Sequence, residues 1–335
     1  MRTCFIHLGL HKTATKSVQI ALSEHARELA RDGYHYPRTG RPRQAPAGHH
    51  NLAWEISQDR RFRRKYGNAL DLCNEITRTD RHVIISTEDF ECSLHHREKF
   101  RKFVASIQNL GVVTCAIVFL RNQIEYAESL YLTLVMLGYS LPFAEFCEEI
   151  LQTGKVHWRE SIFAFRYDVF LEQLAQVPGL ATTVRSYDAP AGETPVGDFL
   201  SVIGLASSRL LSTAQQRHNT RLPLSTTLRR YLVNRGRNET GNHTGRGLLR
   251  RLLIFQRGSA AVPDFVDRLR GAQLLMPVSC QMRFAEAFRE PNRLICREFG
   301  LAPFTRLEPE RFVSFAGPSL SDVFATEDKF LWRQS

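Results

Sequence analysis

Cysteine is scarce in this chain, and its spacing excludes two common kinds of site. Seven cysteines, an odd number, are scattered among 335 residues, and no two are spaced as C-x-x-C. Neither a zinc site nor a redox dithiol is therefore indicated. Long apolar runs are missing too, and none approaches the roughly 18 residues of a membrane-spanning helix. Because the first strand is expected within the first few residues, no room is left for a signal peptide, and we expect a cytoplasmic protein without a transmembrane segment.

Acidic residues are outnumbered in the composition. Lysine and arginine together count 45 against 34 aspartates and glutamates, which gives a net charge of +11. Such a charge favours an anionic partner, for example a nucleotide, a polyanionic glycan or nucleic acid. The basic residues are spread along the chain without an RNA-binding or helix-turn-helix signature, so a nucleic-acid partner is not expected. The apolar fraction of 43% is ordinary for a globular enzyme.

Short apolar strands alternate with helical patterns in the first two thirds of the chain. Strands are expected at Cys4–Leu8, His82–Ser86, Val112–Leu120 and Thr182–Tyr187. The third is continuously apolar, as suits a central parallel strand buried on both faces. This alternation predicts an α/β fold, a P-loop-kinase-like parallel sheet flanked by helices, with ligands at the carboxyl ends of the strands.

Between these strands we expect helices and one long loop. A single helix is expected from Ala14 to Arg31, and residues Asn51 to Thr79 are expected to be helical. The segment Tyr34–His50 contains three prolines, which exclude regular structure. It is interpreted either as a lid that faces the substrate or as a solvated loop.

Strand patterns disappear after Ser207, and the sequence predicts a helical C-terminal extension. We expect residues 1–205 to form the α/β core with the nucleotide site, and residues 206–335 to complete the same domain with helices. The polar, glycine-rich stretch Asn234–Arg246 is left without a role, and the oligomeric state stays open.

An anion site is predicted where the first strand meets the first helix. The stretch Gly9-Leu-His-Lys-Thr-Ala-Thr-Lys-Ser17 lies at this junction. Free N–H groups at a helix start and the positive end of the helix dipole favour a phosphate there, and Lys12 adds a mobile charge. Only Gly9 precedes Lys12, whereas the Walker A loop needs a second glycine before its lysine. An ordinary turn with solvated side chains is the alternative.

A second anion site is predicted at the end of the clearest strand. Arg121 follows that strand, and Ser129 lies eight residues later on the next helix. A guanidinium gives two parallel donors to a phosphate, and the serine hydroxyl gives a third. Parallel strands bring Thr13, Glu88 and Arg121 to the same edge of the sheet.

Both motifs resemble the nucleotide site of sulfotransferases that use 3′-phosphoadenosine 5′-phosphosulfate (PAPS). The sequence Gly-x-His-Lys-Thr-Ala-Thr-x-Ser is similar to their 5′-phosphosulfate loop. Arg121 and Ser129 are similar to the arginine and serine that bind the 3′-phosphate in these enzymes. The proline that usually follows the arginine is replaced here by Asn122. Further stretches similar to bacterial sulfotransferase-like proteins start at Val184 and Arg217, and the resemblance spans about residues 4 to 235.

The resemblance implies PAPS as co-substrate and no metal. It implies a cofactor site made of His11, Lys12, Thr13, Ala14, Thr15, Lys16, Ser17, Arg121 and Ser129. Lys12 is expected to neutralise charge on the leaving phosphate. The base that takes the acceptor proton is expected to be Glu88, at the end of the second strand, or else His50.

The predicted reaction is sulfuryl transfer to a hydroxyl or amine acceptor, which could be anionic or a saccharide. Two other functions remain open at this point. One is an ATP-dependent P-loop kinase, and the other is a non-catalytic nucleotide-binding protein.

Overall fold

The computed structural model describes residues 1–188, 194–205, 230, 234 and 276–304. The chain divides into two compact units, each of which is described by itself. The first unit contains Met1–Arg121, His157–Asn219 and Glu290–Phe304, and the second contains Asn122–Val156, Thr220–Arg289 and Thr305–Ser335. The predictions for residues 206–229 and 235–275 lie outside the described residues. The predicted division at residue 205 stays a prediction.

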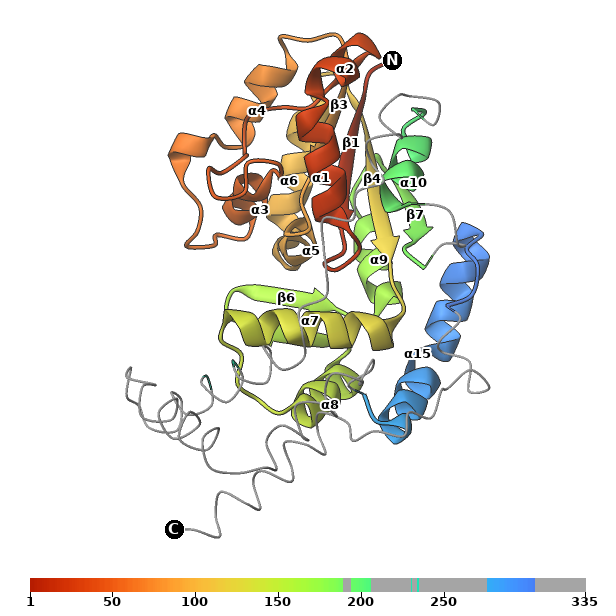
Figure 1. Ribbon diagram of the computed structural model, residues 1–335. Coiled ribbons are helices and arrows are strands. Elements are labelled where there is room, and N and C mark those ends of the chain that lie inside the picture. The colour runs from red at the N-terminus through yellow and green to blue at the C-terminus, as the bar shows by residue number, and fades with distance from the viewer. Residues whose placement is uncertain (189–193, 206–229, 231–233, 235–275, 305–335) are drawn as a thin grey trace. The chain divides into compact units, whose positions relative to one another are not determined.

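The first unit is built on a five-stranded parallel sheet with the order β2-β3-β1-β4-β7 (Figure 1). The strands are β1 (Thr3–Gly9), β2 (Tyr34–His35), β3 (His82–Ser86), β4 (Val113–Leu120) and β7 (Leu180–Ser186). Cys4 of β1 pairs with Val83 on one side and with Thr114 on the other. The predicted α/β class with a parallel sheet flanked by helices is confirmed.

Apolar residues on both faces of the central strands explain this layering. One face is covered by α1 (Thr15–Glu24) and α10 (Pro195–Val202), which contact each other. The cluster on this face includes the buried residues Val18, Leu22, Ile84, Ile117, Phe119 and Phe199. Ala116 and Val118 alternate with these residues along β4 and are equally buried, and α6 (Arg97–Gln108) also contacts β4.

The chain between β1 and β3 differs from the expectation in two places. The expected single helix is two helices, α1 and α2 (Ala26–Arg31), because the backbone leaves helical geometry at His25. The expected helical stretch after Asn51 is three short pieces, namely α3 (His50–Ile56), a 3₁₀ turn (Arg64–Tyr66) and α4 (Ala69–Ile76). Asn68 and Asp71 form a capping box at the start of α4, in which the side chain of each residue accepts a hydrogen bond from the main-chain N–H of the other.

The segment Tyr34–His50 is buried near both ends and exposed at Arg38, Arg43, Gln44 and Pro46. Its first two residues form strand β2, so the expectation of no regular structure is wrong there. The hydroxyl of buried Tyr36 donates to the carbonyl of Ala47 at 2.6 Å, and the main-chain N–H of His49 donates to the carbonyl of Ser86 at 2.9 Å. The first bond joins the two ends of the segment, and the second holds its end against the carboxyl end of β3.

Several short elements follow β3 and β4 in the first unit. They are α5 (Phe90–Ser93), a 3₁₀ turn (Leu94–His96), the hairpin strands β5 (Lys155–Trp158) and β6 (Ser161–Ala164), and α9 (Tyr167–Ala175). Strand β5 spans the boundary between the units, and β6 lies in the first.

The second unit contains α7 (Gln123–Leu137) and α8 (Phe143–Thr153), and it shares α15 (Val278–Phe299) with the first. The ring of Tyr131 packs on Phe143 and Phe146, with centroid distances of 4.8 and 5.3 Å. Helix α15 confirms the predicted helical character of the C-terminal region as far as it is described. Within the described ranges, no helix combines the length and apolarity that crossing a membrane requires.

Candidate functional site

The loop after β1 folds back on itself. Gly9 has a φ of +89°, and an added Cβ would meet the Cα and Cβ atoms of Glu88 at 3.1 Å. The hydroxyls of Thr13 and Thr15 both donate to the carbonyl of Leu10, at 2.6 and 3.2 Å. The glycine therefore permits a close approach to the residue after β3, while the two threonines close the loop.

Helix α1 begins directly after this loop. Its N-cap residue is Ala14, with a φ of +59°, and within the described part of the chain no side chain caps the helix. Alanine has no acceptor for the first N–H groups of the helix, so their partial positive charge stays directed at the loop. Lys16 is exposed and Ser17 is half-buried on the first turn. The predicted residues His11 to Ser17 thus form one continuous loop and helix start.

Arg121, at the carboxyl end of β4, lies against this loop. Its guanidinium Nη1 donates to the main-chain carbonyl of Lys12 at 3.1 Å. Its own carbonyl accepts a bond of 2.7 Å from the hydroxyl of Tyr167, and its guanidinium lies 4.9 Å from the ring centroid of Tyr187. The structure therefore brings together Lys12 and Arg121, as the parallel-strand rule predicts. Ser129 lies on α7 of the second unit, so its approach to Arg121 stays a prediction.

The two cations affect each other. Burial lowers the pKa of Lys12, and the nearby charge of Arg121 lowers it further, whereas the charge of Glu88 acts in the opposite direction. A half-buried lysine beside an arginine is an unfavourable arrangement that an anion between them would relieve. A negatively charged ligand beside Lys12 and Arg121 would lower this repulsion.

Glu88 follows β3 and faces the same loop. Its Oε2 accepts a hydrogen bond of 2.7 Å from Nε2 of Gln19, on the second turn of α1. The charge of Glu88 raises the pKa of both Lys12 and His50, so the carboxylate is within electrostatic reach of both. The structure thus places both predicted base candidates and the predicted lysine at one end of the sheet.

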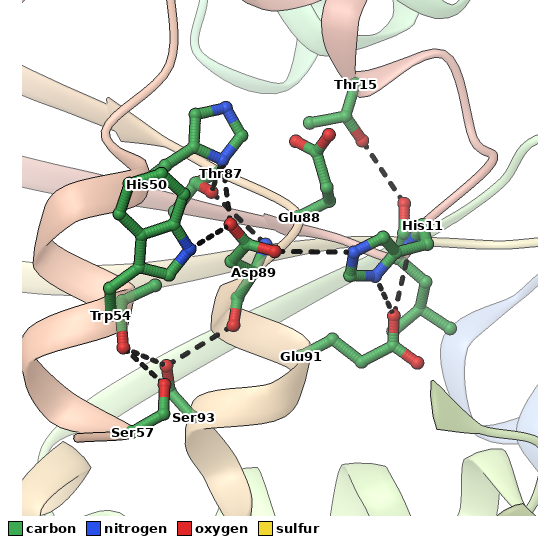
Figure 2. A network of polar contacts seen from close by, with 12 residues as sticks. His11, Thr15, His50, Trp54, Ser57, Thr87, Glu88, Asp89, Glu91 and Ser93 are labelled. Carbon is green, nitrogen blue, oxygen red and sulfur yellow. Dashed lines mark hydrogen bonds and ion pairs between the residues drawn. The ribbon is translucent and has the colours of Figure 1, made fainter. Parts of the chain in front are cut away.

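His50, at the start of α3, is held by the residue after Glu88 (Figure 2). Its Nδ1 lies 2.9 Å from Oδ2 of Asp89 and 2.9 Å from the hydroxyl of Thr87. The indole N–H of Trp54 donates to the same Asp89 oxygen at 2.7 Å. Burial lowers the pKa of His50, but the hydrogen bond to Asp89 and the charges of Glu88 and Asp89 outweigh burial and raise it.

The side chain of His11 lies between two carboxylates. Both its main-chain N–H, at 3.1 Å, and its Nδ1, at 2.7 Å, bond to Oε2 of Glu91. Its Nε2 lies 3.5 Å from Oδ1 of Asp89, and its ring packs edge-on against Phe163. Burial lowers the pKa of His11, but the hydrogen bonds to Asp89 and Glu91 raise it to about 10. The contacts of this side chain thus fix the loop, and its predicted role as a cofactor ligand stays a prediction.

Sequence reasoning missed Asp89, Glu91, Trp54 and Gln19 as members of the site. A signal for two of them exists, because Glu88-Asp-Phe-Glu91 places three carboxylates within four residues directly after a buried strand. Nothing in the local sequence marks Trp54 and Gln19. In the described ranges, no group of three or more histidine, cysteine, aspartate or glutamate side chains is arranged to hold a metal ion.

Comparison with known proteins does not identify a family for this chain. No protein-family model matches the chain, and searches of curated proteins and of solved structures return no similar protein. The functional conclusion therefore depends on the residues of this chain.

Proposed function

We propose that this protein is a PAPS-dependent sulfotransferase that moves a sulfuryl group to a hydroxyl or amine acceptor. The observation that supports the proposal is the hydrogen bond from the Arg121 guanidinium to the carbonyl of Lys12. The bond holds the Arg121 guanidinium against the loop that leads into α1, and the charge of Arg121 acts on the ammonium group of Lys12. A nucleotide with phosphate groups on both its 5′ and 3′ oxygens would give each of these two cations its own phosphate.

The residues of the loop fit such a nucleotide. Lys12 and the N–H groups at the start of α1 would hold the 5′-phosphate, and Arg121 would hold the 3′-phosphate. When bound, PAPS supplies the activated sulfuryl group. Lys12 would neutralise the charge that grows on the leaving phosphate.

Glu88 is the proposed base. A raised pKa favours the imidazolium form of His50, which has no free lone pair to accept a proton. The carboxylate of Glu88 keeps acceptor capacity and is oriented by Gln19. Glu88 therefore takes the proton from the acceptor, and His50 has another role.

The acceptor is proposed to be anionic or sugar-containing, because the chain carries a net charge of +11. The basic segment Arg60–Lys65 adds little to this argument, since three of its five basic side chains already have carboxylate partners. These pairs are Arg60 with Glu160, Arg61 with Asp59, and Arg64 with Asp71. A cytoplasmic location is part of the same proposal.

Thermal stabilisation by ligands tests this function. Adenosine 3′,5′-bisphosphate should raise the melting temperature of the wild type, and Arg121→Ala should remove most of the gain. Arg101→Ala, which changes an exposed arginine of α6, should keep the gain in full. A response to Mg·ATP alone would indicate a kinase and overturn the proposal. A response to the bisphosphate without sulfuryl transfer to any acceptor would indicate a non-catalytic nucleotide-binding protein.

A further inference from the structure

Asp89 is bonded from two sides by elements that are far apart in the sequence (Figure 2). Its Oδ2 accepts bonds from His50 and Trp54 of α3, and its Oδ1 faces His11 of the loop after β1. Its main-chain N–H donates to the hydroxyl of Thr87 at 3.1 Å. The side chain of Asp89 is 11% exposed, so these partners replace most of its water.

The protons in this cluster can be assigned from its geometry. Burial raises the pKa of Asp89, but its hydrogen bonds to His11 and His50 hold it well below the ordinary value. An ionised carboxylate can only accept hydrogen bonds, so Nδ1 of His50 carries a proton. Both ring nitrogens of His11 face carboxylates, Glu91 on one side and Asp89 on the other, so both of them carry protons.

The second nitrogen of His50 faces the Glu88 side of the site. Nε2 lies across the ring from the nitrogen that Asp89 holds. An added Cβ on Gly48 would lie 2.6 Å from this Nε2 and 2.7 Å from Oε1 of Gln19, which places the two atoms near each other. Gln19 in turn donates to Glu88. The imidazole of His50 therefore lies near Gln19, which bonds Glu88, with its Nδ1–H fixed by Asp89 and its Nε2 on the side of Gly48 and Gln19.

We propose that Asp89 is a positioning residue that holds His50 with its Nε2–H toward the Gln19 and Glu88 side, where the group would be transferred, and that couples this histidine to the loop after β1 through His11. His50 then acts as a cationic hydrogen-bond donor, and Glu88 acts as the base. This inference rests on the proposed sulfuryl transfer. Asp89 and Glu88 then have different roles. Asp89 is bonded to two imidazoles and positions His50, whereas Glu88 takes the proton.

The groups that surround His50 determine how it responds to pH. Asp89 and Glu88 face it from the segment after β3, and His11 acts on it from the loop after β1. Arg61, on the segment after α3, is within electrostatic reach of Asp89. The two carboxylates favour the imidazolium, and the charge of His11 opposes it. Removing the charge of Asp89 should therefore shift the titration of His50 to lower pH.

The test is Asp89→Asn, which keeps the shape of the side chain and removes its charge. The imidazole Cε1–H resonance of His50, assigned with His50→Gln, should titrate at a lower pH in this variant than in the wild type. The turnover number should fall by about tenfold or more, an effect of the size expected when a preorganised donor is disturbed. The alkaline fall in turnover should move to lower pH with the His50 resonance, because only the imidazolium donates from both nitrogens.

Three comparisons make the result specific. Asp59→Asn removes another buried carboxylate, which bonds Arg61, and should leave the His50 titration unchanged. Glu91→Gln should weaken binding of the bisphosphate more than Asp89→Asn does, because Glu91 bonds the loop at two atoms of His11. His50→Gln should lower the turnover number while the bisphosphate still binds.

The outcomes separate this inference from the proposed function. If the wild type does not bind the bisphosphate, the proposed function fails, and the inference fails with it. If the wild type binds the bisphosphate and transfers sulfuryl groups, but Asp89→Asn leaves both the His50 titration and the pH profile unchanged, the inference alone is wrong. Circular dichroism and the melting temperature of each variant establish that it is folded.

Discussion

The guanidinium of Arg121 donates a hydrogen bond of 3.1 Å to the main-chain carbonyl of Lys12. These residues follow β4 and β1, two neighbouring strands that pair in parallel from Thr3 and Val113 onward. The pairing delivers both residues to the same edge of the sheet. Two cations held together in this way are tolerated by the fold and favour an anion at the same place.

Replacing Lys12 should separate folding from binding. Because burial and Arg121 lower the pKa of Lys12, its charge opposes folding at neutral pH. Lys12→Met should therefore keep or raise the melting temperature of the ligand-free protein, and it should abolish most of the stabilisation by adenosine 3′,5′-bisphosphate. Differential scanning fluorimetry measures both. Lys102→Met, on the exposed face of α6, should change neither. An unchanged bisphosphate response in Lys12→Met contradicts the proposed site.

Replacing Glu88 should separate binding from chemistry. Glu88→Gln keeps a hydrogen-bonding group next to Gln19 but cannot take a proton. The turnover number should fall by about 100-fold or more, within the range that a general base contributes. The dissociation constant of the bisphosphate, measured by calorimetry, should change little. Full activity in Glu88→Gln together with its loss in His50→Ala would instead identify His50 as the base.

The stability that His11 contributes should depend on pH. The pKa of His11 is raised from its ordinary value of 6.5 to about 10 in the folded protein. A raised pKa stabilises the folded state fully below pH 6.5, and the contribution disappears as pH rises toward 10. The difference in melting temperature between the wild type and His11→Gln should therefore shrink across this interval. A difference that stays constant from pH 6 to about 10 contradicts the ion pairs with Asp89 and Glu91.

Gly48 should tolerate no side chain without loss of activity. A Cβ at this position would lie 2.6 Å from Nε2 of His50 and 2.7 Å from Oε1 of Gln19. Both atoms belong to buried side chains that would have to move, so Gly48→Ala should still fold but with a lower melting temperature. The displaced groups are those that face Glu88, so the turnover number should fall. Wild-type turnover in Gly48→Ala would show that neither His50 nor Gln19 needs its observed position.

Much of the framework could be predicted from the sequence. The apolar runs that end at Leu8, Ser86 and Leu120 identify three parallel strands, and the parallel arrangement then places Lys12, Glu88 and Arg121 at one edge. The break at His25 could not be predicted, because the apolar spacing of α1 and α2 continues across it. Strands β5 and β6 have only four residues each, too few for a clear pattern.

The polar network around the loop depends on contacts that no local pattern encodes. Asp89 and His50 are far apart in the sequence, and only the packing of α3 against the end of β3 brings them together. The side chain of His11 could not be oriented from the motif alone, because its direction depends on Glu91. The use of PAPS and the contribution of Ser129 stay predictions for the same reason, since both depend on a ligand.

The carboxylate of Glu91 joins two backbones as well as a ring. One oxygen accepts from the main-chain N–H of His11, and the other accepts from the main-chain N–H of Ala164 in β6 at 2.7 Å. An aspartate, one methylene shorter, could not span both segments. The β5–β6 hairpin thereby becomes a brace for the loop after β1, so insertions or truncations in that hairpin should alter ligand affinity through this main-chain bond and through the packing of Phe163 on His11.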